Sequence, residues 1–227
     1  MSWKTSNITP IQNKGSRTAV GNYRPVSLTS VVVKVMESII RDHLLDHMMK
    51  NKSFCDAEHG FDPGRSCMTQ LLVVIELWRE MLDSGDPVDA IYLDFSKAFD
   101  IVPHQRLFNK VKTYGVVGDT YEWIKAFLIW HTHQIIANSS LSSWLEMLSG
   151  IPQGSVLGPI LFVLFINDLP DMVQSTAHIF ADDTKVYRKV LTDQDCIEHK
   201  QTLQDSTELF TTLVRPHLEY GNIIWHP

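Results

Sequence analysis

The longest apolar stretch of the chain, SVLGPILFVLFINDLP at residues 155–170, places the strongest constraint on its fold. The stretch is too short to span a bilayer, and Pro159 and polar residues interrupt it. We therefore expect a buried helix. The chain has 227 residues, of which 44% are hydrophobic and 20% charged, so it is long enough for one large domain or two subdomains around a sizeable core.

Short strands and further helices are expected around this helix. The residue patterns predict strands at 7–13, 22–28, 88–95, 177–180 and 184–187, and a hairpin within 133–148. Prolines inside the first two strands indicate edge strands or an irregular hairpin. Helical spacing predicts helices at 31–50, 68–83, 104–114 and 120–130, and a last helix after residue 192. Mixed elements with short antiparallel strands indicate an α+β fold.

The helices carry predictions about burial and capping. One side of helix 31–50 is apolar and is expected to face the core; it comprises Val32, Val35, Met36, Ile39, Ile40 and Leu44. Thr29 or Ser30 is expected to cap this helix, Asp119 the helix at 120–130, and Asp193 the last helix.

Charge and cysteine content exclude several classes of protein. The net charge is −6 and the isoelectric point about 5.9, which counts against a nucleic-acid binder unless a local basic patch exists. Three cysteines without a CxxC spacing suggest neither a zinc site nor a disulfide framework. The first ten residues lack the apolar core of a signal peptide. These features favour an intracellular protein, in the nucleus or cytoplasm, that does not enter a membrane.

Asp182 and Asp183 stand side by side at the expected tip of a hairpin, between AHIF and TKVY. Adjacent carboxylates repel each other unless a cation or solvent screens them, and a solvated turn is the simplest interpretation. Asp94, at the end of an expected strand, supplies a third carboxylate if that strand adjoins the hairpin. Three carboxylates suit Mg²⁺, and two such ions can clamp an in-line phosphoryl displacement.

Five sequence blocks occur in the order found in one protein family. They are NYRPVSLTSVVVKVMES, HGFDPGRSCMTQLL, YLDFSKAFDIVPH, SGIPQGSVLGPILFVLFINDLP and FADDTKVYR. With them, the chain resembles the reverse transcriptase of non-LTR, LINE-like retrotransposons. The resemblance implies the fingers and palm of a right-hand polymerase, with helices packed on an antiparallel palm sheet. It divides the chain into fingers and finger–palm helices at 1–88, the palm at 89–190, and a C-terminal helix with a remnant segment at 191–227.

The resemblance implies that Asp94, Asp182 and Asp183 are the catalytic ligands of two Mg²⁺ ions, with Mn²⁺ as an alternative ion. It also implies that the ring of Phe99 lies under the incoming sugar and selects deoxynucleotides. Without the resemblance, Phe99 would be interpreted as a core aromatic residue.

Further positions match residues that hold nucleotide or template in the family. Gln153 and Gly154 match the loop under the nucleotide and template, where a helix-entry turn is the alternative. Lys14 and Arg24 resemble the finger residues that hold the triphosphate, and Arg65 resembles a template contact. Each of these cations, taken singly, would be interpreted as a solvated surface charge.

Several positions depart from the family pattern. Asp62, His131-Thr132-His133, Gln134 and Ser139 replace residues that are usual there, two of them arginines. We interpret these changes as mutational decay. The end of the chain, TLVRPHLEYGNIIWHP at 212–227, resembles a segment that lies well downstream in the family. We therefore expect the thumb to be largely missing through an internal deletion or truncation.

The function implied is RNA-directed DNA synthesis, in which deoxynucleoside triphosphates extend a DNA primer 3′ end along an RNA template by two-metal phosphoryl transfer. We expect this activity to be impaired. The alternative is a catalytically silent retrotransposon relic or a weak nucleic-acid-binding module. Another palm enzyme, such as a viral RNA-copying polymerase, is disfavoured by Phe99 and by the IPQGSVLGP block.

Overall fold

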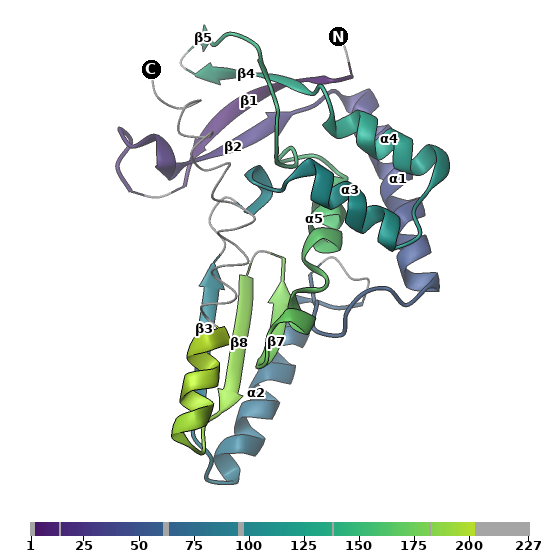
Figure 1. The fold of residues 1–227 in the computed structure, drawn as a ribbon. Helices are drawn as coiled ribbons and strands as arrows, with labels where there is room; N and C mark the ends of the chain where they lie inside the picture. Colours follow the sequence, from purple (N-terminus) through teal and green to yellow (C-terminus); the bar gives the residue numbers. More distant parts are fainter. Residues whose placement is uncertain are drawn as a thin grey trace.

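The structure is a computed structural model that describes residues 3–13, 15–60, 64–94, 98–137, 139–181 and 183–202. It mixes helices with two separate sheets, and α5 (Gly158–Ile166) with the following 3-10 helix η3 (Leu169–Met172) leads from the upper part of the molecule to the lower part (Figure 1). Residues 203–227, on which the thumb prediction rests, lie outside the described residues. The α+β prediction is confirmed.

The upper sheet combines strands from two distant parts of the sequence. Its members are β1 (Thr5–Gln12), β2 (Tyr23–Leu28), β4 (Thr132–Ala137), β5 (Ser140–Leu141) and β6 (Leu145–Glu146). β1 pairs antiparallel with β2 and parallel with β4, and β4 pairs antiparallel with β5 and β6. This sheet takes strands from both sides of residue 88. The expected division of the chain into fingers and palm at that residue stays a prediction.

The prolines of β1 and β2 lie where they cost few sheet hydrogen bonds. Pro10 and Pro25 are paired with each other in the antiparallel register. β2 is at the edge of the sheet, and β4 pairs only with residues 5–8 of β1, so Pro10 lies beyond that pairing. The missing N–H groups are thus confined to positions where proline is tolerated.

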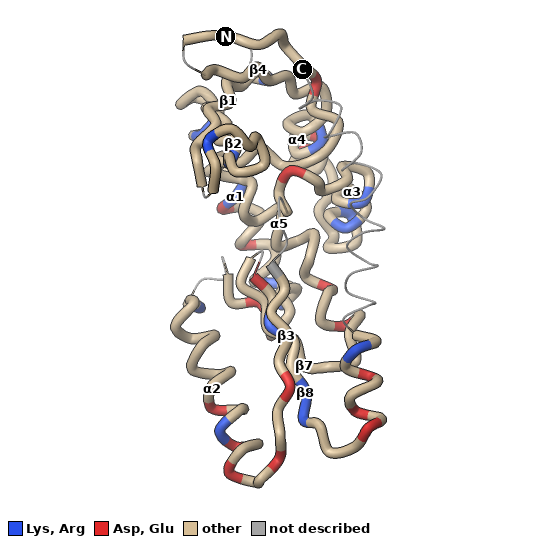
Figure 2. Tube along the Cα trace, turned by 90° about the vertical axis from the view of Figure 1, so that its left-hand side faces the viewer, with Lys and Arg blue, Asp and Glu red and all other residues tan. Residues whose placement is uncertain are grey.

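The lower sheet has the order β3-β8-β7 and is antiparallel throughout. Its strands are β3 (Val88–Asp94), β7 (Thr176–Phe180) and β8 (Asp183–Lys189), and α2 (Cys67–Asp83) lies on one face. Lys185 Nζ donates to Gln70 of α2 at 2.6 Å. Arg188 lies three residues further along β8, on the other face of the strand, and pairs with Glu198 of the helix at 193–202. The two helices therefore cover opposite faces of this sheet (Figure 2).

The core surrounds α5. Eight of its nine residues are buried, all except Pro159, as expected for a helix that is apolar on every side. α3 (His104–Thr113) and α4 (Gly118–Leu128) add their buried sides to the same cluster. No helix among the described residues has both the length and the apolar character needed to cross a membrane.

The predicted core side of helix α1 (Val31–Lys50) is confirmed for Leu44, which is buried, and in part for Ile40, which packs half-buried against the core, but it is wrong for the other four residues. Its buried positions are Val33, Glu37, Leu44 and Met48. The predicted core residues Val32 and Ile39 are 75% and 58% exposed. The spacing of apolar residues did not identify the buried side, because one of its buried positions is occupied by a glutamate, Glu37.

The capping predictions have mixed outcomes. Ser30 caps α1 by accepting a hydrogen bond from the Val33 amide, as expected. The prediction for Asp119 is wrong, since α4 begins at Gly118 with Val117 as its N-cap. Gly118 has φ +65°, which glycine adopts without strain, and Asp119 lies in the first turn. Thr192 replaces the predicted Asp193 at the last helix, where its hydroxyl accepts from the amide three residues on.

Candidate active site

The strand that carries Asp94 lies directly beside the β7–β8 hairpin. In the β3–β8 register Asp94 is paired with Asp183, and Asp183 is in turn paired with Phe180 of β7. Directly paired positions in an antiparallel sheet have Cα atoms about 4.5–5.5 Å apart. The expected adjacency of strand and hairpin is therefore present in the backbone. Asp182 and the side chain of Asp94 lie outside the described residues.

The hairpin turn holds an unusual backbone conformation next to the aspartates. Ala181 has φ +54°, in the left-handed region that residues with a Cβ rarely adopt. Such a conformation costs about 1–3 kcal/mol and persists only when the surroundings fix it. Asp183, after the turn, is exposed. Residues held in such a conformation by their surroundings cluster at functional sites.

Phe99 is half-buried and stacks on Phe162 of α5, with ring centroids 4.5 Å apart. Its carbonyl oxygen accepts a hydrogen bond from the Ile151 amide at 2.7 Å. The residue thus joins the core helix to the loop that precedes it. This packing accounts for an aromatic residue at position 99 whether or not the ring also meets a substrate.

The loop that contains Gln153 and Gly154 is tied to two other elements. Gln153 Nε2 donates to Asp100 Oδ1 at 2.7 Å, and the Gln153 carbonyl accepts from the Ser27 amide of β2 at 2.7 Å. Gly154 has φ +90°, and a Cβ there would lie 3.2 Å from the Ser27 carbonyl oxygen. Glycine is therefore required both by its conformation and by the close approach of β2. Phe99, Gln153 and Gly154 are brought together.

Glu37 holds the other end of this loop and was not identified from the sequence. Its buried carboxylate accepts hydrogen bonds from the amides of Val156 at 2.6 Å and Leu157 at 3.0 Å, just before α5. Burial is the main cause that raises the pKa of Glu37, while these two amide hydrogen bonds act in the opposite direction. The sequence contains no signal for this role, because the burial of Glu37 is evident only from the structure.

The candidate phosphate and template cations have different environments. Arg24 is exposed on β2, three residues from Ser27, whereas Lys14 lies outside the described residues. Arg65 donates to the carbonyl oxygens of Asp56 and Glu58, and its side chain is 30% exposed. Part of its hydrogen-bonding capacity is therefore used within the protein.

His131 and Gln134, which depart from the family pattern, make contacts within the protein. His131 is 1% exposed, and its Nε2 lies 3.1 Å from Ser6 Oγ. Burial lowers the pKa of His131 to about 4. Gln134 is half-buried and donates to Asn7 Oδ1 at 2.9 Å. Both side chains serve the upper sheet in this chain.

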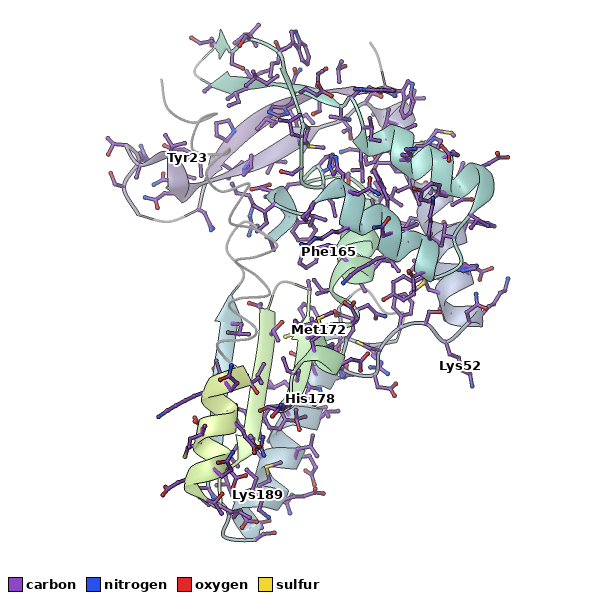
Figure 3. The ribbon with its side chains drawn as sticks, viewed as in Figure 1. Tyr23, Lys52, Phe165, Met172, His178 and Lys189 are labelled. Carbon is purple, nitrogen blue, oxygen red and sulfur yellow. The ribbon has the colours of Figure 1, made fainter. Side chains whose placement is uncertain are left out.

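Histidines near the hairpin are packed as aromatic residues. His178 of β7, labelled in Figure 3, stacks on Tyr187 with centroids 5.7 Å apart and lies 5.9 Å from the ring of His59. Burial is the first cause that lowers the pKa of His178. His104 Nε2 lies 2.7 Å from the Gly150 carbonyl oxygen. These contacts give His104 and His178 structural roles.

No group of three or more His, Cys, Asp or Glu side chains among the described residues is arranged to hold a metal ion. The expected ligand set is not covered by that finding, because it includes Asp182 and the Asp94 side chain. The donors in that set are all carboxylate oxygens, which are the ligands that Mg²⁺ prefers. The composition of the expected set therefore fits Mg²⁺ or Mn²⁺.

Polymerases of mobile elements resemble this chain in sequence. The probable RNA-directed DNA polymerase from transposon BS of Drosophila melanogaster is 32% identical over 169 residues, which are 74% of this chain and 18% of the relative. The RNA-directed DNA polymerase from mobile element jockey of the same species is 32% identical over 196 residues, or 82% of this chain and 21% of the relative. The chain thus spans about a fifth of the length of these curated relatives.

Solved structures of telomerase share the fold. Apo telomerase from Candida tropicalis has a TM-score of 0.67 at 11% identity, covering 93% of this chain and 43% of that one. A form truncated from the C-terminal domain has a TM-score of 0.66 at 10% identity and covers 92% and 48%. At these identities the likeness concerns the fold alone.

A family model described as "Reverse transcriptase (RNA-dependent DNA polymerase)" matches residues 11–214. This match includes every strand except most of β1, together with the loop of Gln153 and the hairpin of Asp183. Together with the polymerases of transposon BS and jockey, it confirms the resemblance to reverse transcriptases of non-LTR retrotransposons. The chain belongs to the reverse transcriptase (RNA-dependent DNA polymerase) family.

Proposed function

We propose that this chain is the fingers and palm of an RNA-directed DNA polymerase that adds deoxynucleotides to a primer 3′ end. The observation that carries the proposal is the pairing of Asp94 with Asp183 in the β3–β8 register. It brings the end of β3 to the hairpin whose sequence carries Asp182 and Asp183.

Asp94, Asp182 and Asp183 would hold two divalent ions, Mg²⁺ or Mn²⁺. When bound, such a pair activates the primer hydroxyl and stabilises the leaving pyrophosphate. The carboxylates position the ions and are themselves relieved of mutual repulsion. This accounts for two adjacent like charges on a strained turn.

The incoming nucleotide would lie on the exposed side of the loop of Gln153, which packs directly against β2. The absence of a Cβ at Gly154 lets the loop backbone approach closely, and Phe99 would exclude the 2′-hydroxyl of a ribonucleotide. Lys14 and Arg24 would bind the triphosphate, as cationic side chains bind phosphate oxygens.

RNA template and DNA primer are the proposed partners, and Arg65 the proposed template contact. Charge is unevenly distributed over the protein: lysines and arginines occur on α3 and around β2, whereas the far end of α2 is mainly acidic (Figure 2). Nucleic acid would therefore approach the upper part of the molecule.

Weak, distributive synthesis is the proposed level of activity, and a catalytically silent module is the second candidate. The net charge of −6 favours low affinity for a polyanion. The deciding experiment is extension of oligo(dT) on poly(rA) by the purified 227-residue chain, with and without Mg²⁺. Addition of a few nucleotides per encounter, dependent on Mg²⁺, supports the polymerase. Absence of extension at every Mg²⁺ and Mn²⁺ concentration supports the silent module, and long products would contradict the proposed impairment.

A further inference from the structure

Residues 57–60 run alongside the hairpin and form a parallel bridge to it. Glu58 is bridged to Ile179 of β7. The His59 amide donates to the Ile179 carbonyl at 2.9 Å, and the Ile179 amide donates to the Ala57 carbonyl at 2.8 Å. This short segment, which we call the brace, thus extends the lower sheet at the outer edge of β7.

The side chain of Glu58 reaches from the brace to the turn between β7 and β8. Glu58 is fully buried, and its Oε1 accepts hydrogen bonds from the Gly60 amide and, at 3.4 Å, from the Ala181 amide. Ala181 is the left-handed residue that directly precedes the aspartate pair. The carboxylate is therefore in contact with the strained residue whose conformation sets the direction of the turn.

The brace itself is held in place by two further features. A Cβ on Gly60 would lie 2.8 Å from the Ala181 amide nitrogen and 2.8 Å from Glu58 Oε1, so only glycine fits there. Arg65 Nη1 donates to the Glu58 carbonyl at 3.0 Å. Glu58 thus acts on the turn from a fixed position.

We propose that Glu58 is a positioning residue that fixes the β7–β8 turn, and through it the place of Asp183 relative to Asp94. This inference rests on the proposed polymerase function. A catalytic group displaced by about 1 Å can lose on the order of a hundredfold in rate. A glutamine at position 58 keeps an acceptor oxygen in the same place, whereas leucine fills similar space without one.

The experiment compares Glu58→Gln and Glu58→Leu in Mg²⁺-dependent primer extension. We expect Glu58→Leu to lower kcat about a hundredfold, with KM for the deoxynucleotide changed less than about threefold. Glu58→Gln should restore most of kcat. The matched control is Gln70→Leu, which removes another fully buried polar side chain, one that contacts Lys185 of β8 and not the turn. It should lower the melting temperature and leave kcat unchanged.

A second measurement does not depend on activity. Amide hydrogen exchange at the β7–β8 turn, residues 180–183, should accelerate in Glu58→Leu beyond its effect on the rest of the chain, and not in Glu58→Gln or Gln70→Leu. If the unaltered chain shows no extension, the polymerase proposal fails and exchange alone decides the role of Glu58. Equal exchange of the turn in all variants, or equal loss of kcat in Glu58→Leu and Gln70→Leu, would overturn the inference.

Discussion

Asp94 and Asp183 occupy directly paired positions of β3 and β8, although 88 residues separate them in the sequence. This relationship yields the first prediction. Asp183→Asn should lower primer extension about a hundredfold or more, because loss of a metal ligand removes several kcal/mol of transition-state stabilisation and each 1.36 kcal/mol is tenfold in rate. Single-nucleotide incorporation rates measure the effect.

The matched control for Asp183 is Asp89→Asn, an exposed carboxylate near the other end of β3. It should leave the rate unchanged. Equal activities of the Asp183 variant and the unaltered chain would remove Asp183 from the catalytic set.

Phe99→Val tests selection of the sugar. A smaller side chain opens room for a 2′-hydroxyl, so the ratio of ribonucleotide to deoxynucleotide incorporation should rise. The variant also loses the stacking contact with Phe162, which should lower the free energy of unfolding by about 1–2 kcal/mol. Phe162→Leu, on the buried side of the same stack, should destabilise without changing the ratio. An unchanged ratio in Phe99→Val would leave Phe99 as a core residue only.

Glu37→Leu should destabilise the fold by about 2–5 kcal/mol. It leaves the buried amides of Val156 and Leu157 without their acceptor, at about 1–3 kcal/mol for each group. Glu37→Gln retains one acceptor oxygen and should recover part of the loss. Urea unfolding measures both, with the exposed Glu122→Ala of α4 as the control that should change little. Equal stability of the two Glu37 variants would show that the loop does not need this acceptor.

Acidification should weaken the fold through His131. Burial lowers its pKa from 6.5 to about 4 in the folded protein, so the unfolded chain binds the proton more readily between these values. The contribution of His131 to stability is present above pH 6.5 and is lost as the pH falls towards 4, on the order of 3 kcal/mol in total.

His131→Gln has no proton to bind at this position, so its free energy of unfolding should fall less steeply between pH 6.5 and 4 than that of the unaltered chain. Denaturant melts at several pH values give the two slopes. Parallel slopes would mean that His131 does not titrate on unfolding.

The sequence was sufficient where apolar residues decide the structure. α5 is apolar on every side, so its burial follows from composition alone. The core side of α1 was predicted only in part: Leu44 is buried as expected, but Glu37, counted as polar, also belongs to the buried side. A buried carboxylate becomes understandable only once the amides of a segment more than 100 residues away are seen to need an acceptor.

The candidate site shows the same limit. Family motifs identified positions 94, 99, 153, 154 and 183, and the fold brings Phe99, Gln153 and Gly154 together through Asp100 and Ser27. The family motifs could not indicate that Arg65 donates a hydrogen bond to the brace or that His131 is buried. Such environments depend on contacts between distant segments, which a linear pattern does not contain.

The pairing of β3 with β8 also bears on how such a sequence can change over generations. Side chains alternate between the two faces of a strand, so a one-residue slip moves each of them to the opposite face. An inserted codon between Val88 and Asp94 would set a different residue opposite Asp183, whereas many exchanges of one apolar residue for another would preserve the register. Copies of this gene should therefore vary in the identity of β3 residues long before they vary in its length.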